Sequence, residues 1–112
     1  MRKNVFVLTL SLLITIPFFA QKANIFHNRN FWKENPSIKT IDKYISEGHD
    51  ITTLNQYAFD AVSWAFIEKT DNETIKYLLT YKGNDVNKLT HDGRTYIFWA
   101  AYKNNLEMMK YQ

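Results

Sequence analysis

The chain has 112 residues, with 14 basic and 11 acidic side chains, a formal net charge of +3 and no cysteine. The lack of cysteine excludes a disulfide framework, a thiolate metal site and lipid attachment through a thiol. The length suits one small domain with a limited core.

The N-terminal segment has the layout of a secretory signal peptide. Arg2 and Lys3 precede a nearly continuous apolar run over residues 5–19. That run of about 15 residues is shorter than the roughly 20 that a transmembrane helix needs, so a cleaved signal is favoured over a permanent anchor. We expect residues 1–20 to be removed between Ala20 and Gln21, giving a periplasmic or secreted protein without stable membrane insertion.

Removal of the signal peptide would lower the net charge of the chain. Arg2 and Lys3 leave with it, so 12 basic residues face 11 acidic ones in the remainder. The lysines are spread among glutamates and aspartates, whereas nucleic-acid binding needs a concentrated basic surface. Nucleic acid is therefore not an expected partner.

The first helical unit follows a polar leader. Residues 21–30 carry few apolar side chains, and we expect them to form a flexible leader. Phe31 and Trp32 are interpreted as the remains of a first helix. A second helix is predicted from an apolar stripe at helical spacing, which consists of Ile38, Ile41, Tyr44 and Ile45. Gly48 is expected to end it.

The second unit is predicted to begin near Asp60. Its first helix runs through about Glu68 on an apolar face that contains Ala61, Val62, Trp64, Ala65 and Phe66. The segment 70–72 offers capping oxygens for a second helix, whose stripe consists of Ile75, Leu78 and Leu79. Gly83 is expected to stop this helix in a left-handed conformation.

The third unit repeats this plan. Thr95 is the expected cap of a first helix, whose apolar residues are Ile97, Phe98, Trp99, Ala100 and Ala101. Asn104 and Asn105 are expected to form a tight turn. A second helix then runs through Leu106, Met108 and Met109.

The last two units are related by a spacing of 35 residues, as in Trp64 and Trp99. The segment 48–52, Gly-His-Asp-Ile-Thr, returns as Gly-Asn-Asp-Val-Asn over 83–87. A period of this size is typical of repeat solenoids, in which each unit buries its apolar face against the next.

These motifs resemble those of ankyrin repeats. Residues 83–87 are similar to the family's GADVN, 92–95 to its DGRT helix start, 100–101 to its paired alanines and 105–107 to its NLE motif. The chain is identified as an exported, bacterial-type ankyrin repeat protein. The resemblance implies an all-α helix-turn-helix solenoid of about two and a half units over 31–112, which binds partners with its hairpin tips and inner helix face.

Three departures from the family pattern matter. Tyr96 and Phe98 replace the proline and histidine of TPLH, so the histidine-centred bonds between repeats are expected to be lost. Ala58 stands where Gly93 would align, so the second unit's turn is not expected to copy the third's. Gln112 falls where a core leucine is expected, so we interpret the last repeat as incomplete. We therefore expect the chain to be truncated. The alternative is a natural short protein that pairs with a partner.

No catalytic constellation is present in the sequence. His27, His49 and His91 share no metal-ligand spacing, and no phosphate-binding glycine motif occurs. Ser63 lies in a helical stripe without the elbow that a serine nucleophile needs. The acidic residues 68, 71 and 73 are interpreted as a solvated loop. We expect no enzyme activity, no metal and no cofactor.

Binding residues are instead predicted on the hairpin tips. The candidates are Tyr57, Phe59, Lys88, His91 and Arg94, of which the aromatic and arginine types are enriched in binding hot spots. Trp64, Phe66, Phe98 and Trp99 are expected to be core. The predicted function is a non-catalytic module or adaptor that binds another protein. A docking segment of a larger envelope enzyme or accessory protein and a membrane-tethered binding protein are the alternatives.

Overall fold

The computed structural model describes residues 23–112. The predicted signal peptide 1–20, with its cleavage point at Ala20 and Gln21, lies outside the described residues. The described part consists of short helices in the order η2 (Ile25–His27), α2 (Arg29–Lys33), α3 (Ile38–Ser46), α4 (Ala61–Ile67), α5 (Asn72–Leu78), η3 (His91–Gly93), α6 (Tyr96–Tyr102) and α7 (Leu106–Tyr111).

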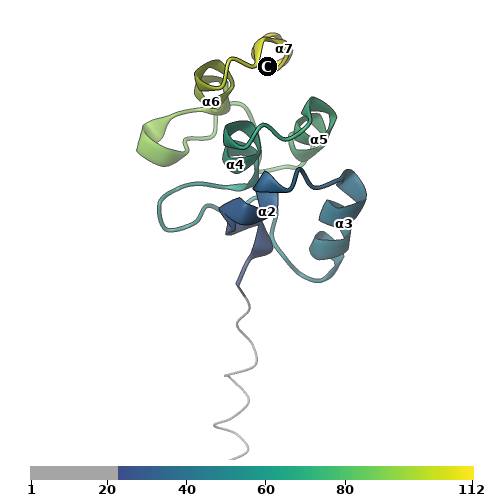
Figure 1. Ribbon diagram of the computed structural model, residues 1–112. Helices are drawn as coiled ribbons and strands as arrows, with labels where there is room; N and C mark the ends of the chain where they lie inside the picture. Colours follow the sequence, from purple (N-terminus) through teal and green to yellow (C-terminus); the bar gives the residue numbers. More distant parts are fainter. Residues whose placement is uncertain (1–22) are drawn as a thin grey trace, which may run out of the picture.

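The helices lie in two rows (Figure 1). Helices α2, α4 and α6 form one row, α3, α5 and α7 form the other, and the loops before α4 and α6 project to the opposite side of the first row. Within residues 23–112 there is no β-strand, only an isolated bridge between Thr90 and Arg94. The predicted all-α class of stacked helix pairs is confirmed.

The core lies between the two rows, and α4 is its centre. Helix α4 packs against α2, α5 and α6. Its fully buried side chains are those of Ala61, Val62, Ser63, Ala65 and Phe66. Small residues in this helix let its neighbours approach closely, because a methyl group takes little room. Helices α2, α3, α5 and α7 add buried side chains to this core, namely Trp32, Ile41, Ile75, Leu78 and Met108.

The predicted flexible leader is wrong for the described part of 21–30. Phe26 has no exposed surface, and its carbonyl oxygen accepts a bond of 2.9 Å from Trp32 Nε1. Asn24 caps η2 and also donates to the carbonyl oxygen of Asp50 at 2.7 Å. The segment is polar because its amides bridge to the next loop, which composition alone does not distinguish from a loose chain.

Two glycines predicted to end helices behave differently. Gly48, with φ of 99°, follows α3, and its N–H bonds to Ile45 O while His49 N–H bonds to Tyr44 O. This is a Schellman motif, so Gly48 ends the helix as predicted. Helix α5, in contrast, ends at Leu78, so Gly83 does not stop it. Gly83 turns the following loop with φ of 106° and its Cα lies against Thr52.

The predicted helix caps are correct in place but not always in chemistry. Asp60 caps α4 through a reciprocal box with Ser63, in which Ser63 N donates to Asp60 Oδ1 at 2.9 Å and Asp60 N donates to Ser63 Oγ at 2.8 Å. Asp71 and Thr95 precede α5 and α6 without a side-chain cap bond. The capping oxygens expected from 70–72 and from Thr95 are therefore not used in this way.

The predicted stripe of α6 is correct only in part. Trp99 and Ala100 are buried, but Phe98 is 37% exposed and Ile97 45% exposed. Tyr96 is fully buried instead, because it points back toward α4 and donates from its hydroxyl to Asp60. Among the described residues no helix covers the outward side of α6, so its apolar side chains there remain in contact with solvent.

Candidate functional site

Two equivalent turns position the predicted binding residues. Asn55 N donates to Phe59 O at 2.7 Å, and Thr90 N donates to Arg94 O at 2.8 Å. Ala58 adopts φ of 63°, close to the 69° of Gly93. Asp92 also has a positive φ, of 58°, whereas Tyr57 at the equivalent place does not. The second unit's turn is therefore not a full copy of the third's, as expected, although the alanine accepts the strained left-handed conformation. The matching backbone bonds still bring Phe59 and Arg94 to equivalent places.

Phe59 lies between two other rings. Its ring centroid is 4.2 Å from that of Trp64 and 4.4 Å from that of His91, with interplanar angles of 17° and 16°. His91 Nδ1 lies 2.8 Å from Tyr57 O, so this nitrogen carries the proton and donates it to the carbonyl. Neighbouring hairpins are thus linked by stacking and by a hydrogen bond. Tyr57 remains 63% exposed at the tip.

Arg94 lies over the aromatic side chains of α6. Its Cζ is 4.3 Å from the ring centroid of Phe98 and 5.7 Å from that of Trp99. The cation–π geometry holds the guanidinium over the helix. Its closest carboxylate is exposed Asp92, at 3.9 Å. Arg94 makes no side-chain hydrogen bond to the residues that the structure describes, so its donors are open to a ligand.

A groove of about 380 Å³ joins these side chains to the first row of helices. Its apolar lining consists of Phe59, Trp64, Ile67, Phe98, Trp99 and Tyr102. Its charged lining consists of Arg29, Arg94 and Lys103, all of them basic. We call this the aromatic–basic groove. It lies on the inner helix face beside the hairpins, where the resemblance implied a binding surface.

Several lining residues were not predicted as binding residues. Arg29 was assigned to the leader, yet its Cζ lies 5.3 Å from the Trp64 ring centroid and its Nε donates to Glu68. Trp64 was expected to be core but is only partly buried, and its Nε1 is buried without an acceptor in the described structure. Tyr102 and Lys103 follow the predicted stripe of α6. The helical periodicity could have placed Tyr102 on the side of Phe98, which is four residues earlier.

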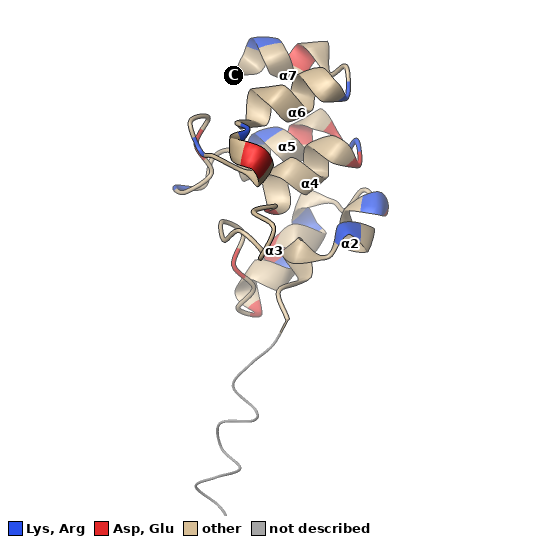
Figure 2. Cartoon of the chain, turned by 90° about the vertical axis from the view of Figure 1, so that its left-hand side faces the viewer, with Lys and Arg blue, Asp and Glu red and all other residues tan. Residues whose placement is uncertain are grey.

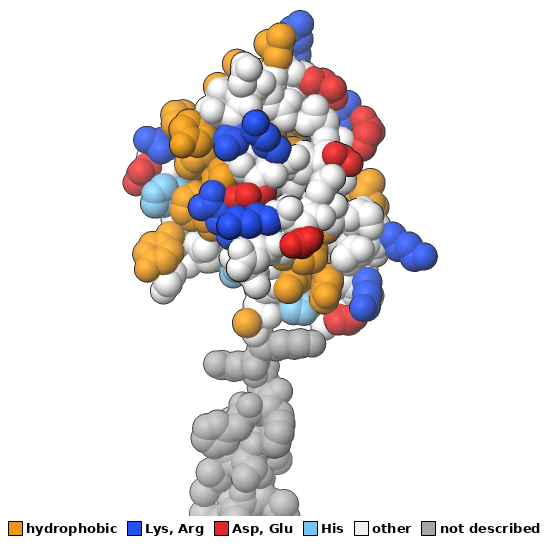
Figure 3. Space-filling model, in the orientation of Figure 1, with side chains coloured by type: hydrophobic (Ala, Val, Ile, Leu, Met, Phe, Trp, Pro, Cys, Tyr) orange, Lys and Arg blue, Asp and Glu red, His pale blue; other side chains and the backbone are white. Residues whose placement is uncertain are grey.

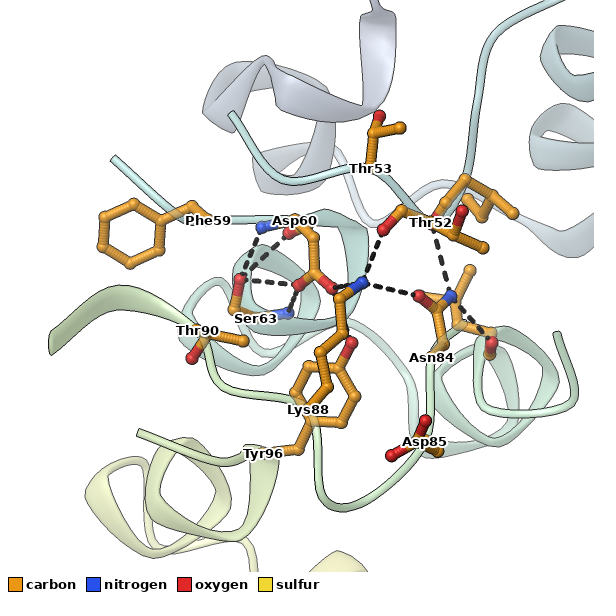
Figure 4. Close-up of polar contacts among 12 residues, drawn as sticks. Thr52, Thr53, Phe59, Asp60, Ser63, Asn84, Asp85, Lys88, Thr90 and Tyr96 are labelled. Atoms are coloured by element: carbon orange, nitrogen blue, oxygen red, sulfur yellow. Dashed lines mark hydrogen bonds and ion pairs between the residues drawn. The ribbon is translucent and has the colours of Figure 1, made fainter. Parts of the chain in front are cut away.

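Lys88, by contrast, has an internal role. Its Nζ is 2.8 Å from Asp60 Oδ2 and 3.2 Å from Asn84 Oδ1, and it also donates to the carbonyl oxygen of Thr52 (Figure 4). The Lys88 side chain is only 15% exposed and that of Asp60 is fully buried. All three ammonium donors therefore have acceptors within the fold, which leaves none for a partner.

The Asp60–Lys88 pair belongs to a polar network between repeats. Tyr96 OH donates to the same Asp60 Oδ2 at 2.5 Å (Figure 4). Burial and the adjacent negative charge raise the pKa of Tyr96 far above its usual range, so its hydroxyl stays a donor. Asn84 donates to Ile51 O at 3.2 Å and to Leu78 O at 3.1 Å. Asp60, Lys88 and Tyr96 thus bridge repeats where the family's histidine is missing.

Charge over the molecule is mixed. In Figure 3 the basic and acidic side chains are interspersed over the face in view and form no large patch of one sign. Residues 23–112 contain no cluster of three metal-ligating side chains. In the same range no helix has the length and apolar character needed to cross a bilayer.

Comparison with known proteins finds a family match. Residues 59–111 match the family model described as "Ankyrin repeats (many copies)". No curated protein and no solved structure matches the chain.

Proposed function

The chain is an ankyrin repeat protein over residues 59–111, and we propose that it binds another protein in the aromatic–basic groove and is exported to the periplasm or the cell exterior. Ankyrin repeats generally mediate interactions between proteins, and the family is typically non-catalytic. The observation that carries the proposal is the groove itself, with its six apolar and three basic lining residues.

The composition of the groove favours a protein partner. Tryptophan, tyrosine and arginine side chains are enriched in binding hot spots, where they fill well-packed pockets from which water is excluded. Tyr57 at the hairpin tip and Tyr102 on α6 are 63% and 66% exposed. A partner that fills the groove would bury the ring of Tyr102, and one that also covers the hairpin tip would bury the ring of Tyr57.

Site-specific photo-crosslinking in the cells that make the protein tests this function. A photo-reactive residue is placed at Tyr102 in the groove or, as the matched control, at Tyr111 on α7, which is 53% exposed. We expect a discrete protein adduct from position 102 and none from position 111. The double variant Tyr57→Ala with Arg94→Ala should remove the adduct while helix content by circular dichroism is unchanged. Equal adducts from both positions would refute the groove as the binding site.

Export is tested separately by the N-terminal mass of the purified protein. The signal-peptide reading of 1–20 predicts a chain that begins at Gln21. An intact Met1 in a membrane fraction would favour the tethered alternative instead. A longer reading frame with a catalytic region would favour the docking segment of an envelope enzyme.

A further inference from the structure

The aromatic–basic groove has an uneven charge. None of its lining residues is acidic, whereas Arg29, Arg94 and Lys103 are all basic. In Figure 2, basic segments of α2 and of the turn after α6 lie along the same side of the molecule. Outside the expected signal peptide the chain has 12 basic and 11 acidic residues, and this near balance conceals a groove that is locally positive.

The three basic side chains are not equally available. Arg29 is paired with Glu68, whose side chain is only 14% exposed. Lys103 has no carboxylate within ion-pair distance among residues 23–112, and its Nζ lies 5.8 Å from the ring centroid of Tyr102. Arg94 has only the distant contact with Asp92. Arg94 and Lys103 are thus cations held near aromatic rings with unused donors.

We propose that the groove recognises an acidic segment of the partner protein that carries an aromatic side chain beside its carboxylates. Arg94 and Lys103 bind the carboxylates, and the aromatic side chain packs against Phe98 and Tyr102. A guanidinium matches a carboxylate with two parallel N–H donors, which adds geometric selectivity to charge attraction. This inference rests on the proposed function, since it names the chemistry of the partner.

The dimensions and packing of the groove support a short segment. Its volume of about 380 Å³ is at the lower end of the usual range for ligand sites. The rings of Phe98 and Tyr102 are nearly parallel, with an interplanar angle of 10° and centroids 6.2 Å apart. Both are exposed, so a third ring can pack on them without displacing a core side chain.

Fluorescence anisotropy with short labelled peptides tests the proposal on the intact protein. The probe peptide alternates Glu with Phe; one control replaces each Glu by Lys, and another replaces each Phe by Gly. We expect the probe to bind at least about tenfold more tightly than either control, since both charge-assisted hydrogen bonds and aromatic packing contribute. Added salt should weaken binding of the probe, because the attraction involves exposed charges.

Matched variants locate the binding. Lys103→Gln in the groove is compared with Lys43→Gln on α3, because Lys43 also lies over a tyrosine, with its Nζ 5.5 Å from the ring centroid of Tyr44. We expect Lys103→Gln to weaken binding of the probe about threefold or more, Arg94→Gln to weaken it about tenfold or more, and Lys43→Gln to leave it unchanged. Circular dichroism should be the same for all three variants.

Several outcomes overturn the proposal. The proposal is wrong if the probe does not bind, or if the Lys or Gly peptide binds as tightly as the probe. It is also wrong if Lys103→Gln and Lys43→Gln have equal effects, or if heparin or single-stranded DNA binds more tightly than the probe. If crosslinking at position 102 still yields a protein adduct, the proposed function stands and only the acidic chemistry is wrong. If that adduct is also absent, both fail.

Discussion

At the scale of single residues, the buried carboxylate of Asp60 determines the role of Lys88. The sequence placed Lys88 on a loop and suggested a partner contact. The structure instead directs its ammonium group into the fold, 2.8 Å from Asp60 Oδ2. No sequence pattern announces this contact, because it joins a loop to the cap of a helix 28 residues earlier in the chain.

We predict that Lys88→Met destabilises the protein by about 3 to 5 kcal/mol, because it leaves a buried carboxylate without its cation. Urea unfolding followed by circular dichroism measures the change. Lys82→Met, at an exposed lysine in the preceding loop, should change the free energy of unfolding by less than about 0.5 kcal/mol. A loss below about 1 kcal/mol for Lys88→Met would show that Asp60 does not depend on this pair.

At Ala58 we predict a substitution that stabilises the protein. Its φ of 63° costs an L-residue about 1 to 2 kcal/mol, whereas glycine adopts it freely but has a more flexible unfolded state. Ala58→Gly should therefore raise the free energy of unfolding by about 0.5 to 1 kcal/mol. Ala101→Gly, inside α6, should lower it by about 1 kcal/mol. A lower urea midpoint for Ala58→Gly would contradict the left-handed turn.

Asp50 gives a prediction for pH. Its Oδ1 accepts bonds from Thr52 N at 2.9 Å and Thr52 Oγ1 at 2.8 Å. The backbone bond from Thr52 is the main reason that the pKa of Asp50 lies below its usual value. A carboxyl group whose pKa is lowered by folding contributes stability that is present above the unfolded pKa and is lost as pH falls through the folded pKa.

Wild-type stability should therefore fall more than that of Asp50→Asn when pH is lowered from about 5 to about 2. The free energy of unfolding in urea, measured over this range, checks the difference. Asp71→Asn is the control, because Asp71 makes no side-chain cap bond to α5. Parallel pH profiles for the wild type and Asp50→Asn would contradict the prediction.

At the scale of elements, α6 shows which parts of a helical stripe the sequence can predict. The apolar periodicity correctly placed α6 and its buried Trp99. It failed for Ile97 and Phe98, because burial depends on whether another helix covers that side. The predictions that Gly83 ends α5 and that the leader is flexible failed for a related reason. Asn84 donates to the carbonyl oxygen of Leu78, where α5 ends, and Asn24 donates to that of Asp50, and helical periodicity reveals neither bond.

Trp99→Ala should cost about 3 to 5 kcal/mol, since it empties a site that is only 5% exposed and removes the bond of 2.8 Å from Nε1 to Thr90 Oγ1. Tyr102→Ala, on the same helix but 66% exposed, should cost less than about 1 kcal/mol. Thermal melting distinguishes the two. An unaltered melting curve for Trp99→Ala would show that Trp99 is not part of the core.

At the scale of the whole molecule, the groove was only half predictable. The motifs correctly suggested the hairpins and the inner helix face, which brought Phe59 and Arg94 into consideration. Arg29, Tyr102 and Lys103 were missed because the groove combines three segments that are distant in sequence. A single sequence reveals the repeat, but the meeting of these side chains follows only from how the helix pairs stack.

The three tryptophan indoles allow the central claim, that a partner segment fills the groove, to be tested directly. Trp64 and Trp99 line the groove, whereas Trp32 is fully buried with its Nε1 bonded to Phe26 O. In a nitrogen–proton correlation spectrum recorded during titration with the Glu–Phe peptide, we predict that the Trp64 indole signal shifts progressively. The signal of Trp32 should stay in place. A shift confined to Trp32, or no shift in any indole at saturating peptide, would contradict the account.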